Sequence, residues 1–301
     1  MSMIECHGLT KVYGGTKALN NLSFKIEENK ITGLIGRNGA GKTTLLKIIA
    51  GFLKETAGDL KVFSEKPFNN LQVSANVIFI HDQMNLPTAL NLKELLETGA
   101  SFYPNWDSEL ANRLFDYFSL HPLQHYNGLS KGMKSTFNII FGLSARAPLT
   151  MFDEPTSGMD AAVRQDFYRA LLKDYLAYPR TIIISSHHLN EIEDLLEDIL
   201  LVKDGKELLH TPVADLKEWA IGLQGKTAVI NEWTQNNEVI YTKSIGMDQS
   251  YIVVRNHFSE TDWHQRARNA GIDLTPVTAS DLCVYLTSKT NGGIDDVFNK
   301  G

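Results

Sequence analysis

A glycine-rich loop that follows an apolar run and opens a helix limits the possible folds of this chain more than any other feature. The loop reads Gly36-Arg37-Asn38-Gly39-Ala40-Gly41-Lys42-Thr43, after the apolar run Ile31 to Ile35 and before a helix-forming stretch that stops at Gly51. Glycines let the backbone curl so that successive N–H groups point at phosphate oxygens, and the helix N-terminus adds a favourable dipole. The strand and helix context argues against a chance glycine-rich turn. The pattern predicts a phosphate-binding loop.

Two side chains of this loop carry the predicted nucleotide chemistry. Lys42 is placed to reach the β- and γ-phosphates, and the hydroxyl of Thr43 is placed to bind Mg²⁺. A nucleotide with Mg²⁺ is therefore the predicted ligand, and the loop by itself leaves kinase, GTPase and ATPase activity open. The residues predicted to contact the nucleotide from this segment are Gly36, Asn38, Gly39, Gly41, Lys42, Thr43 and Thr44.

A second apolar run ends in two carboxylates. Leu149 to Phe152 reads as a strand, and Asp153 and Glu154 follow it directly. The first carboxylate can hold Mg²⁺, and the second can polarise an attacking water. An Asp-Glu pair in a solvated loop or a helix cap is common, but the apolar strand before this pair favours a catalytic role. The pair therefore favours nucleotide hydrolysis.

Strand-like and helical stretches alternate along the first 220 residues. Val77 to Ile80 and Thr181 to Ser186 read as buried strands, and alternation of strands with helices predicts an α/β fold with a mainly parallel sheet. Leu22 to Ile26 and Ile31 to Ile35 flank a polar turn and predict a β-hairpin. The region of about residues 85–140, with helical periodicity from Leu92 to His121, predicts a helical subdomain.

The pattern of apolar and polar residues changes beyond about residue 222. Three strand-like runs, Ala228 to Asn231, Glu238 to Lys243 and Tyr251 to Arg255, precede two helical stretches, Glu260 to Ala270 and Ala279 to Ser288. We therefore predict two domains, residues 1–220 and a small α+β domain at residues 222–301.

The charge and hydropathy of the chain exclude several classes of protein. Lys and Arg number 29 against 35 Asp and Glu, which gives a net charge of −6. Without a bulk positive field, no nucleic-acid partner is expected. No apolar run reaches the roughly 18 residues of a membrane span, and Met1 to Thr10 reads as a first strand and not as a secretory signal. Cys6 and Cys283 lie far apart in the sequence, which fits a reducing cytosol.

Three further motifs lie in a fixed order around the acidic pair. They are Leu129-Ser130-Lys131-Gly132-Met133, then Ser157-Gly158-Met159-Asp160, then His187 at the end of a strand. Together with the loop and the acidic pair, this series resembles the ATP-binding cassette (ABC) family, specifically the ATPase subunit of an ABC transporter. The resemblance covers about residues 3 to 220. It implies a P-loop NTPase fold with an antiparallel β subdomain and a helical subdomain.

The resemblance also assigns roles to single residues. Tyr13 looks like the aromatic residue that stacks on adenine. Ser130 and Gly132 match the signature sequence, which binds the γ-phosphate of ATP held by the other subunit. Asp160 resembles the loop aspartate that links the two sites of a dimer. His187 resembles the switch histidine that contacts the γ-phosphate, and with Glu154 it belongs to the predicted catalytic residues.

Two departures from the family pattern stand out. The signature has Lys131 and Met133 where the commonest form has Gly and Gln, but it keeps the two residues that match phosphate contacts. At the position of the glutamine loop, ungapped counting points to Asp82, whereas Gln83 has the expected chemistry. We favour Gln83 as the Mg²⁺ and water contact, with Asp82 as the alternative.

One segment of the helical region indicates a branch of the family. Ser101-Phe102-Tyr103-Pro104-Asn105-Trp106-Asp107, followed by an amphipathic helix and the signature, resembles ABC-2-type exporters of drugs, antimicrobial peptides and related amphipathic compounds. The aromatic residues could instead simply fill the core of the helical subdomain.

This branch implies a definite assembly. The chain would be a dimerising ATPase at the cytoplasmic face of the cell membrane, paired with a separate transmembrane permease subunit and with a second ATPase subunit, identical or not. Three alternatives stay open: a soluble ABC ATPase that acts on ribosomes or DNA, a regulatory cassette without turnover, and an importer.

Overall fold

The computed structural model describes residues 2–257 and 262–288 of the 301-residue chain. The chain divides into two compact units, Met1–His210 and Thr211–Gly301. The domain assignment from the sequence, residues 1–220 and 222–301, stays a prediction. Within the described residues, none of the helices combines the length and the apolar character that crossing a membrane requires.

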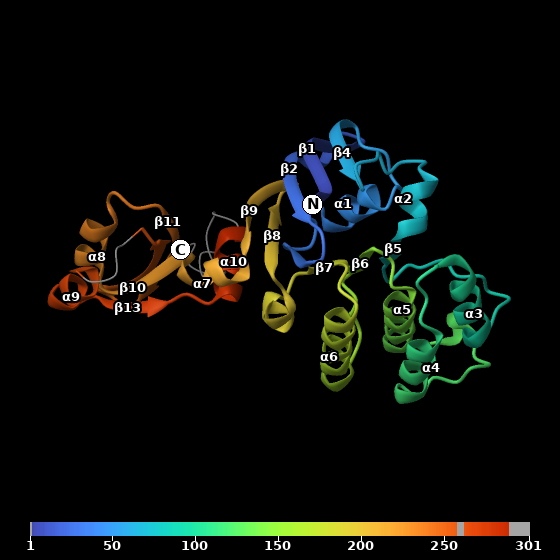
Figure 1. The fold of residues 1–301 in the computed structure, drawn as a ribbon. Helices are drawn as coiled ribbons and strands as arrows, with labels where there is room; N and C mark the ends of the chain where they lie inside the picture. The colour runs from blue at the N-terminus through green and yellow to red at the C-terminus, as the bar shows by residue number, and fades with distance from the viewer. Residues whose placement is uncertain (1, 258–261, 289–301) are drawn as a thin grey trace. The chain divides into compact units, whose positions relative to one another are not determined.

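A six-stranded sheet forms the centre of the first unit (Figure 1). Its strand order is β5-β6-β7-β3-β8-β9, and the pairs from β5 to β8 are parallel. This confirms the predicted α/β class with a mainly parallel sheet. The strands are β3 (Ile31–Ile35), β5 (Val77–Ile80), β6 (Leu149–Asp153), β7 (Thr181–Ser186), β8 (Asp198–Lys203) and β9 (Lys206–Pro212).

The predicted hairpin between residues 22–26 and 31–35 is wrong. All five residues of β3 are buried, and the strand lies between β7 and β8 with both neighbours parallel to it. A strand that is apolar at every position needs cover on both faces, which the centre of a parallel sheet provides. β2 (Thr16–Glu27) instead alternates between buried and exposed residues, and it pairs with β1 (Ser2–Tyr13) in another sheet.

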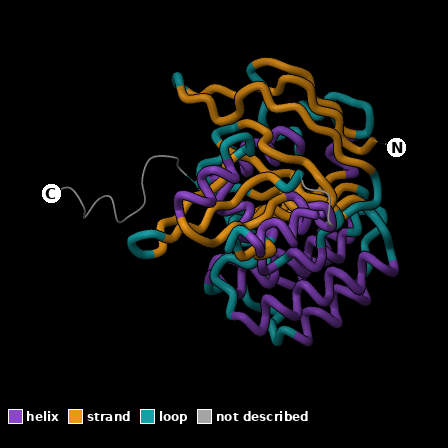
Figure 2. The backbone as a smooth tube through the Cα atoms, turned by 90° about the vertical axis from the view of Figure 1, so that its left-hand side faces the viewer, coloured by secondary structure: helices purple, strands orange, loops and turns teal. Residues whose placement is uncertain are grey.

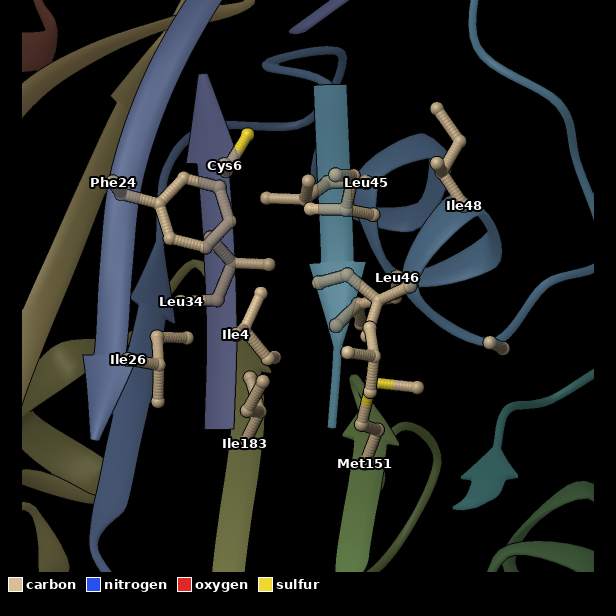
Figure 3. Packing of buried hydrophobic residues seen from close by; sticks show 14 of the residues in the cluster. Ile4, Cys6, Phe24, Ile26, Leu34, Leu45, Leu46, Ile48, Met151 and Ile183 are labelled. Atoms are coloured by element: carbon tan, nitrogen blue, oxygen red, sulfur yellow. The ribbon is translucent and has the colours of Figure 1, made fainter. Parts of the chain in front are cut away.

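The second sheet of this unit has the order β2-β1-β4, with β4 at Ala57–Val62 and all pairs antiparallel. Helix α1 (Lys42–Ile49) shares one hydrophobic cluster with both sheets. Figure 3 shows this cluster, with Ile4 and Phe24 from the antiparallel sheet, Leu45 and Leu46 from α1 and Met151 from the parallel sheet. Because α1 begins within the glycine-rich loop, this packing fixes the position of the loop.

Helices α4, α5 and α6 lie on the other side of the parallel sheet in Figure 1, and Figure 2 shows helices, in purple, gathered on one side of the strands, in orange. Helices α3, α4 and α5 confirm the predicted helical character of the region. The bounds are α2 (Leu71–Asn76), α3 (Leu92–Phe102), α4 (Ser108–Tyr117), α5 (Lys131–Ala145) and α6 (Ala161–Ala177). Three short 3-10 turns lie at Tyr126–Gly128, Leu189–Glu191 and Glu193–Leu195.

The second unit has a four-stranded antiparallel sheet with the order β11-β12-β10-β13. Its central β-α-β-β-α-β sequence with this strand order is the ferredoxin-like arrangement. The elements are α7 (Val213–Trp219), β10 (Ala220–Lys226), α8 (Thr227–Thr234), β11 (Val239–Ile245), β12 (Gln249–Arg255), α9 (Asp262–Asn269), β13 (Asp273–Pro276) and α10 (Ala279–Thr287).

The predicted strand at residues 228–231 is wrong, since this segment lies in helix α8. Ile230 and Thr234, four residues apart, are its buried residues, and the ring of Trp233 stacks on Trp263 with centroids 4.5 Å apart. A short apolar run does not distinguish a strand from a buried helix face. The predicted strands at 238–243 and 251–255 are confirmed within one or two residues, as is the helix at 279–288. The predicted helix at 260–270 is confirmed from Asp262, and residues 260 and 261 lie outside the described residues.

Candidate nucleotide site

The glycine-rich loop runs from the end of β3 to the start of α1, and two of its glycines are required by contact with other strands. A Cβ on Gly36 would lie 2.4 Å from the carbonyl oxygen of Val202. A Cβ on Gly41, which has φ +105°, would lie 2.5 Å from the carbonyl oxygen of Ala18. Both positions therefore admit only glycine without a shift of the backbone. The loop is held in one shape by its neighbours.

Lys42 lies inside this loop with a side chain that is only 6% exposed. Its Nζ donates to the carbonyl oxygen of Gly36 at 2.7 Å and lies 3.2 Å from Oε1 of Glu154. A buried ammonium needs such partners because desolvation of an unpaired charge is costly. The lysine is thus held within the curl of the loop, beside the acidic pair.

Thr43 and the end of β6 meet through a short hydrogen bond. The Thr43 hydroxyl donates to Oδ2 of Asp153 at 2.6 Å. The other carboxylate oxygen of Asp153 accepts a hydrogen bond of 2.5 Å from the hydroxyl of Ser185 on β7. The carboxylate is therefore fixed from both sides, by α1 and by the neighbouring strand.

Glu154 is the residue at which β6 gives way to the next loop, and its backbone has φ +49°, in the left-handed region. Its amide N–H donates to the hydroxyl of Ser185 at 3.0 Å. Its Oε2 lies 2.9 Å from Nδ1 of His187, which follows β7. Non-glycine residues at positive φ are uncommon and cluster at functional sites. Because Oε1 of Glu154 faces Lys42 and Oε2 faces His187, the carboxylate bridges these two side chains.

These side chains fit the two predicted ligands. A threonine hydroxyl and a carboxylate at 2.6 Å form a set of hard oxygen donors, which Mg²⁺ prefers. Backbone N–H groups at the start of α1 and the ammonium of Lys42 fit the phosphates of a nucleotide. Thr44 lies in the first turn of α1, and Asn38 and Gly39 are exposed in the loop before it.

The Ser130 to Met133 segment forms the start of α5. The Ser130 hydroxyl accepts a hydrogen bond from the amide of Met133 at 3.3 Å and so caps the helix. A Cβ on Gly132 would lie 2.8 Å from the carbonyl oxygen of Gly158, so the two backbones are in close contact. The hydroxyl of Ser135 donates to the carbonyl oxygen of Ser157 at 2.9 Å. The start of α5 and the loop after β6 therefore form one rigid surface.

Comparisons with known proteins identify the family. A family model described as ABC transporter matches residues 19–157. The bacitracin transport ATP-binding protein BcrA of Bacillus licheniformis is 30% identical over 243 residues, which cover 77% of this chain and 79% of BcrA. The chain belongs to the ABC transporter family. It is an ATP-binding subunit of this family, and its reaction is ATP hydrolysis.

Two more comparisons agree with this assignment. The SkfA peptide export ATP-binding protein SkfE of Bacillus subtilis is 27% identical, and the match covers 78% of this chain and 99% of SkfE. A dimeric post-hydrolysis structure of the ATP-binding cassette MJ0796, bound to ADP and Pi, superposes with a TM-score of 0.62 and 23% identity, over 70% of this chain and 99% of that one. The first unit therefore has the fold of an ABC cassette.

The ABC residues predicted from the sequence fall into two groups in this structure. Contacts join five of them into one cluster, formed by Gly36, Lys42, Thr43, Asp153 and Glu154, and His187 joins the cluster through Glu154. The signature residues Ser130 and Gly132 and the loop residue Asp160 make their contacts at the starts of α5 and α6. The carboxylate of Asp160 caps α6 by accepting hydrogen bonds from the amides of Ala162 and Val163.

Tyr13 lies at the end of β1, 46% exposed, and Nζ of Lys11 lies 5.2 Å from its ring centroid. Gln83 lies in the turn after β5, and its side chain lines a surface cavity of about 630 Å³. Asp82 is exposed in the same turn. Both glutamine-loop candidates thus stay predictions.

Ser185 is a site residue that the sequence analysis did not single out. Its hydroxyl joins Asp153 and the amide of Glu154, so it orients both carboxylate-bearing residues. A signal was present in the sequence, because Ser185 and Ser186 directly follow three isoleucines at the end of the strand. Polar residues at the carboxyl ends of parallel strands collect at the site edge of the sheet.

Proposed function

We propose that this chain is the ATP-hydrolysing subunit of an ABC exporter, in which two ATPase subunits close around two ATP molecules with Mg²⁺. One observation carries the proposal: Lys42, Thr43, Asp153, Glu154 and His187 converge on one point at the N-terminus of α1. Basic, hydroxyl and carboxylate groups in this arrangement suit hydrolysis of a phosphoanhydride.

The proposed chemistry divides the work among these side chains. Lys42 exchanges its contact with Glu154 for the β- and γ-phosphates when ATP binds, which frees the carboxylate to orient water for in-line attack. His187, on the opposite oxygen of that carboxylate, holds the γ-phosphate side of the site. Mg²⁺ held by Thr43 and Asp153 would neutralise charge that develops on the phosphates. Gln83 would contribute to the same metal and water site.

The remaining predicted residues have proposed roles in the composite nucleotide site that two subunits would form. Ser130 and Gly132 would bind the γ-phosphate of ATP held by the second subunit, with the helix start of α5 as the anion site. Asp160 would link the two sites, and Tyr13 would stack on adenine. The rigid contact between Gly132 and Gly158 supports this assignment, since it lets the signature and the Asp160 loop move as one surface.

We further propose that a separate membrane subunit docks at the cavity lined by Gln83, and that the chain lies at the cytoplasmic face of the membrane. The cavity also includes Phe52, Leu86 and Tyr103, and the side chain of Phe52 is 62% exposed. A cavity that combines an exposed aromatic residue with polar groups such as His81 and Asn85 suits an amphipathic helix. Gln83 lines the same cavity and is the proposed Mg²⁺ and water contact, so movement of the membrane subunit in the cavity would change this contact.

The names of relatives support export of a peptide or drug. SkfE is named for peptide export and BcrA for bacitracin transport. An importer, a ribosome- or DNA-associated ATPase and a regulatory cassette without turnover are the other candidates. The bridge from Glu154 to His187 favours a cassette with turnover over a regulatory one.

Sensitivity of cells to amphipathic peptides and drugs tests the exporter proposal. Cells that lack the chain should become more sensitive to at least one such compound and should retain more of it. The wild-type chain should restore resistance, and the Glu154→Gln variant should not, because export needs turnover. Unchanged sensitivity and unchanged efflux across a panel of amphipathic peptides and drugs would contradict export.

Co-purification tests the docking surface. Phe52→Asp should reduce recovery of a multi-span membrane protein with the tagged chain, because it replaces an exposed aromatic contact by a charge that opposes burial. Leu176→Asp, on α6, is the matched control, since this leucine is 69% exposed and lies outside the cavity. Equal recovery with both variants would contradict docking at the cavity.

A further inference from the structure

The turn that follows β5 is organised by the imidazole ring of His81. The ring stacks on Phe79, with centroids 4.8 Å apart, and Phe79 in turn contacts the ring of Phe52 at 5.9 Å. His81 also lines the cavity that includes Gln83. The imidazole is therefore fixed on one side by aromatic packing at the docking cavity.

The same ring closes the turn that carries the glutamine-loop candidates. Nδ1 of His81 accepts a hydrogen bond from the backbone N–H of Gln83 at 3.2 Å. A side chain that bonds the backbone two residues ahead is the Asx-turn pattern, which Asn and Asp usually form. Asp82 lies inside the closed turn. The bond therefore sets the direction of both candidate side chains.

The backbone of His81 is tied to the signature helix as well. Its carbonyl oxygen accepts a hydrogen bond of 3.3 Å from Nδ2 of Asn138, which is 3% exposed on α5. Helix α5 begins with the Ser130 cap. A buried amide that bonds a loop carbonyl holds the loop in place, because a buried amide left unpaired would be costly. One histidine thus joins the turn to α5 and to the aromatic packing.

We propose that His81 is a positioning residue for ATP hydrolysis, which accepts a hydrogen bond from the backbone N–H of Gln83 and so fixes the glutamine-loop turn at the docking cavity. This inference rests on the proposed role of that turn. Loss of the Nδ1 acceptor releases the turn, and a misplaced water or metal contact lowers the rate of hydrolysis more than it weakens ATP binding.

Two substitutions at His81 distinguish the hydrogen-bond acceptor from the aromatic packing of the ring. His81→Phe keeps an aromatic ring for the stack on Phe79 but removes the acceptor. His81→Asn keeps an acceptor at the same distance from the backbone but removes the ring. We expect kcat to fall about ten-fold or more in the Phe variant, with ATP affinity within about two-fold, and to stay within about three-fold of wild type in the Asn variant.

A matched control exists elsewhere in the chain. Nδ1 of His121 accepts a hydrogen bond from the amide of Leu123 at 3.3 Å, so it closes the same kind of turn after α4. His121→Phe removes an equivalent bond outside the glutamine-loop turn. It should leave kcat and ATP affinity unchanged. A general effect of breaking such a turn would lower kcat in both Phe variants.

Amide hydrogen exchange of peptides that contain Gln83 gives a readout that does not depend on turnover. Exchange should be faster in His81→Phe and close to wild type in His81→Asn. Equal exchange and equal kcat in all three proteins would overturn the inference, as would an equal loss of kcat in the Phe and Asn variants.

Gln83→Ala and Asp82→Ala test the proposed role of the turn separately. If neither lowers kcat while His81→Phe still speeds exchange, the turn exists but its proposed function fails.

Discussion

At the level of single residues, the site is held by side chains that fix one another and not by one dominant bond. The strained backbone of Glu154 is stabilised because the Ser185 hydroxyl accepts a hydrogen bond from its amide N–H. The same hydroxyl donates a hydrogen bond to the carboxylate of Asp153. A residue at positive φ costs of order 1–3 kcal/mol, so it persists only where its surroundings determine it. The geometry of the acidic pair therefore depends on β7 as much as on β6.

Thr43→Val tests the metal-binding half of the site. Valine has nearly the same shape but lacks the hydroxyl that bonds Asp153. The Mg²⁺ concentration for half-maximal ATP binding should rise about ten-fold or more, because one oxygen ligand is lost. Titration of Mg²⁺ against a fluorescent ATP analogue checks this.

The control for this test is Thr43→Ser, which keeps the hydroxyl and should bind Mg²⁺ like the wild type. Nucleotide affinity in EDTA should differ by no more than about two-fold among the three proteins, since the phosphate contacts of the loop remain. An unchanged Mg²⁺ requirement in the Val variant would exclude the hydroxyl as a ligand.

Sequence motifs predicted the loop and the acidic pair because their chemistry demands particular residues at particular spacings. They did not predict Ser185 or His81, whose roles depend on which strands become neighbours. The pairing of β6 with β7 is a property of the sheet, and it brings Ser185 to Asp153 across 32 positions of sequence.

At the level of elements, a buried charge network joins the ends of several helices. The guanidinium of Arg146, at the end of α5, donates to Asp174 on α6 and pairs with Asp107, which caps α4. The second oxygen of Asp174 lies 2.8 Å from Arg180, whose side chain is 5% exposed. Burial lowers the pKa of the Arg180 guanidinium, because removing the charge from water is unfavourable. Asp174 is the centre of the network.

Asp174→Leu should therefore destabilise the first unit by about 3–5 kcal/mol, because it leaves the buried Arg180 without its carboxylate. The matched control is Asp166→Leu on the same helix, which removes an exposed hydrogen bond to Tyr117 and should cost about 1 kcal/mol or less. Urea unfolding, read from peptides of the first unit by mass spectrometry, measures both. Equal losses would contradict the central role of Asp174.

The element-level errors of the sequence analysis have one cause. A short apolar run does not reveal its partner, so the sequence predicts a hairpin of β3 with β2 and a strand at the start of α8, both of which are wrong. Pairing in the parallel sheet determines the position of β3, and the packing of Trp233 on Trp263 favours the helix at α8. Both depend on contacts between segments distant in sequence.

At the level of the whole molecule, the two units have separate hydrophobic cores. The core of the first unit includes α1 and both of its sheets, and the core of the second includes Leu223, Ile230 and Val254. All clustered nucleotide-site residues lie in the first unit. The ferredoxin-like unit therefore adds no residue to the described ATP cluster.

The measurement that tests the account most directly is ATP hydrolysis by the purified chain and by Glu154→Gln, with size-exclusion chromatography of both in ATP. We expect Mg²⁺-dependent turnover by the wild type, and at least about a hundred-fold lower kcat in the variant, because its amide cannot accept a proton from water. The variant should also elute as an ATP-bound dimer, while the wild type returns to monomer. Turnover by the variant close to that of the wild type would contradict the assignment of Glu154 as the catalytic base.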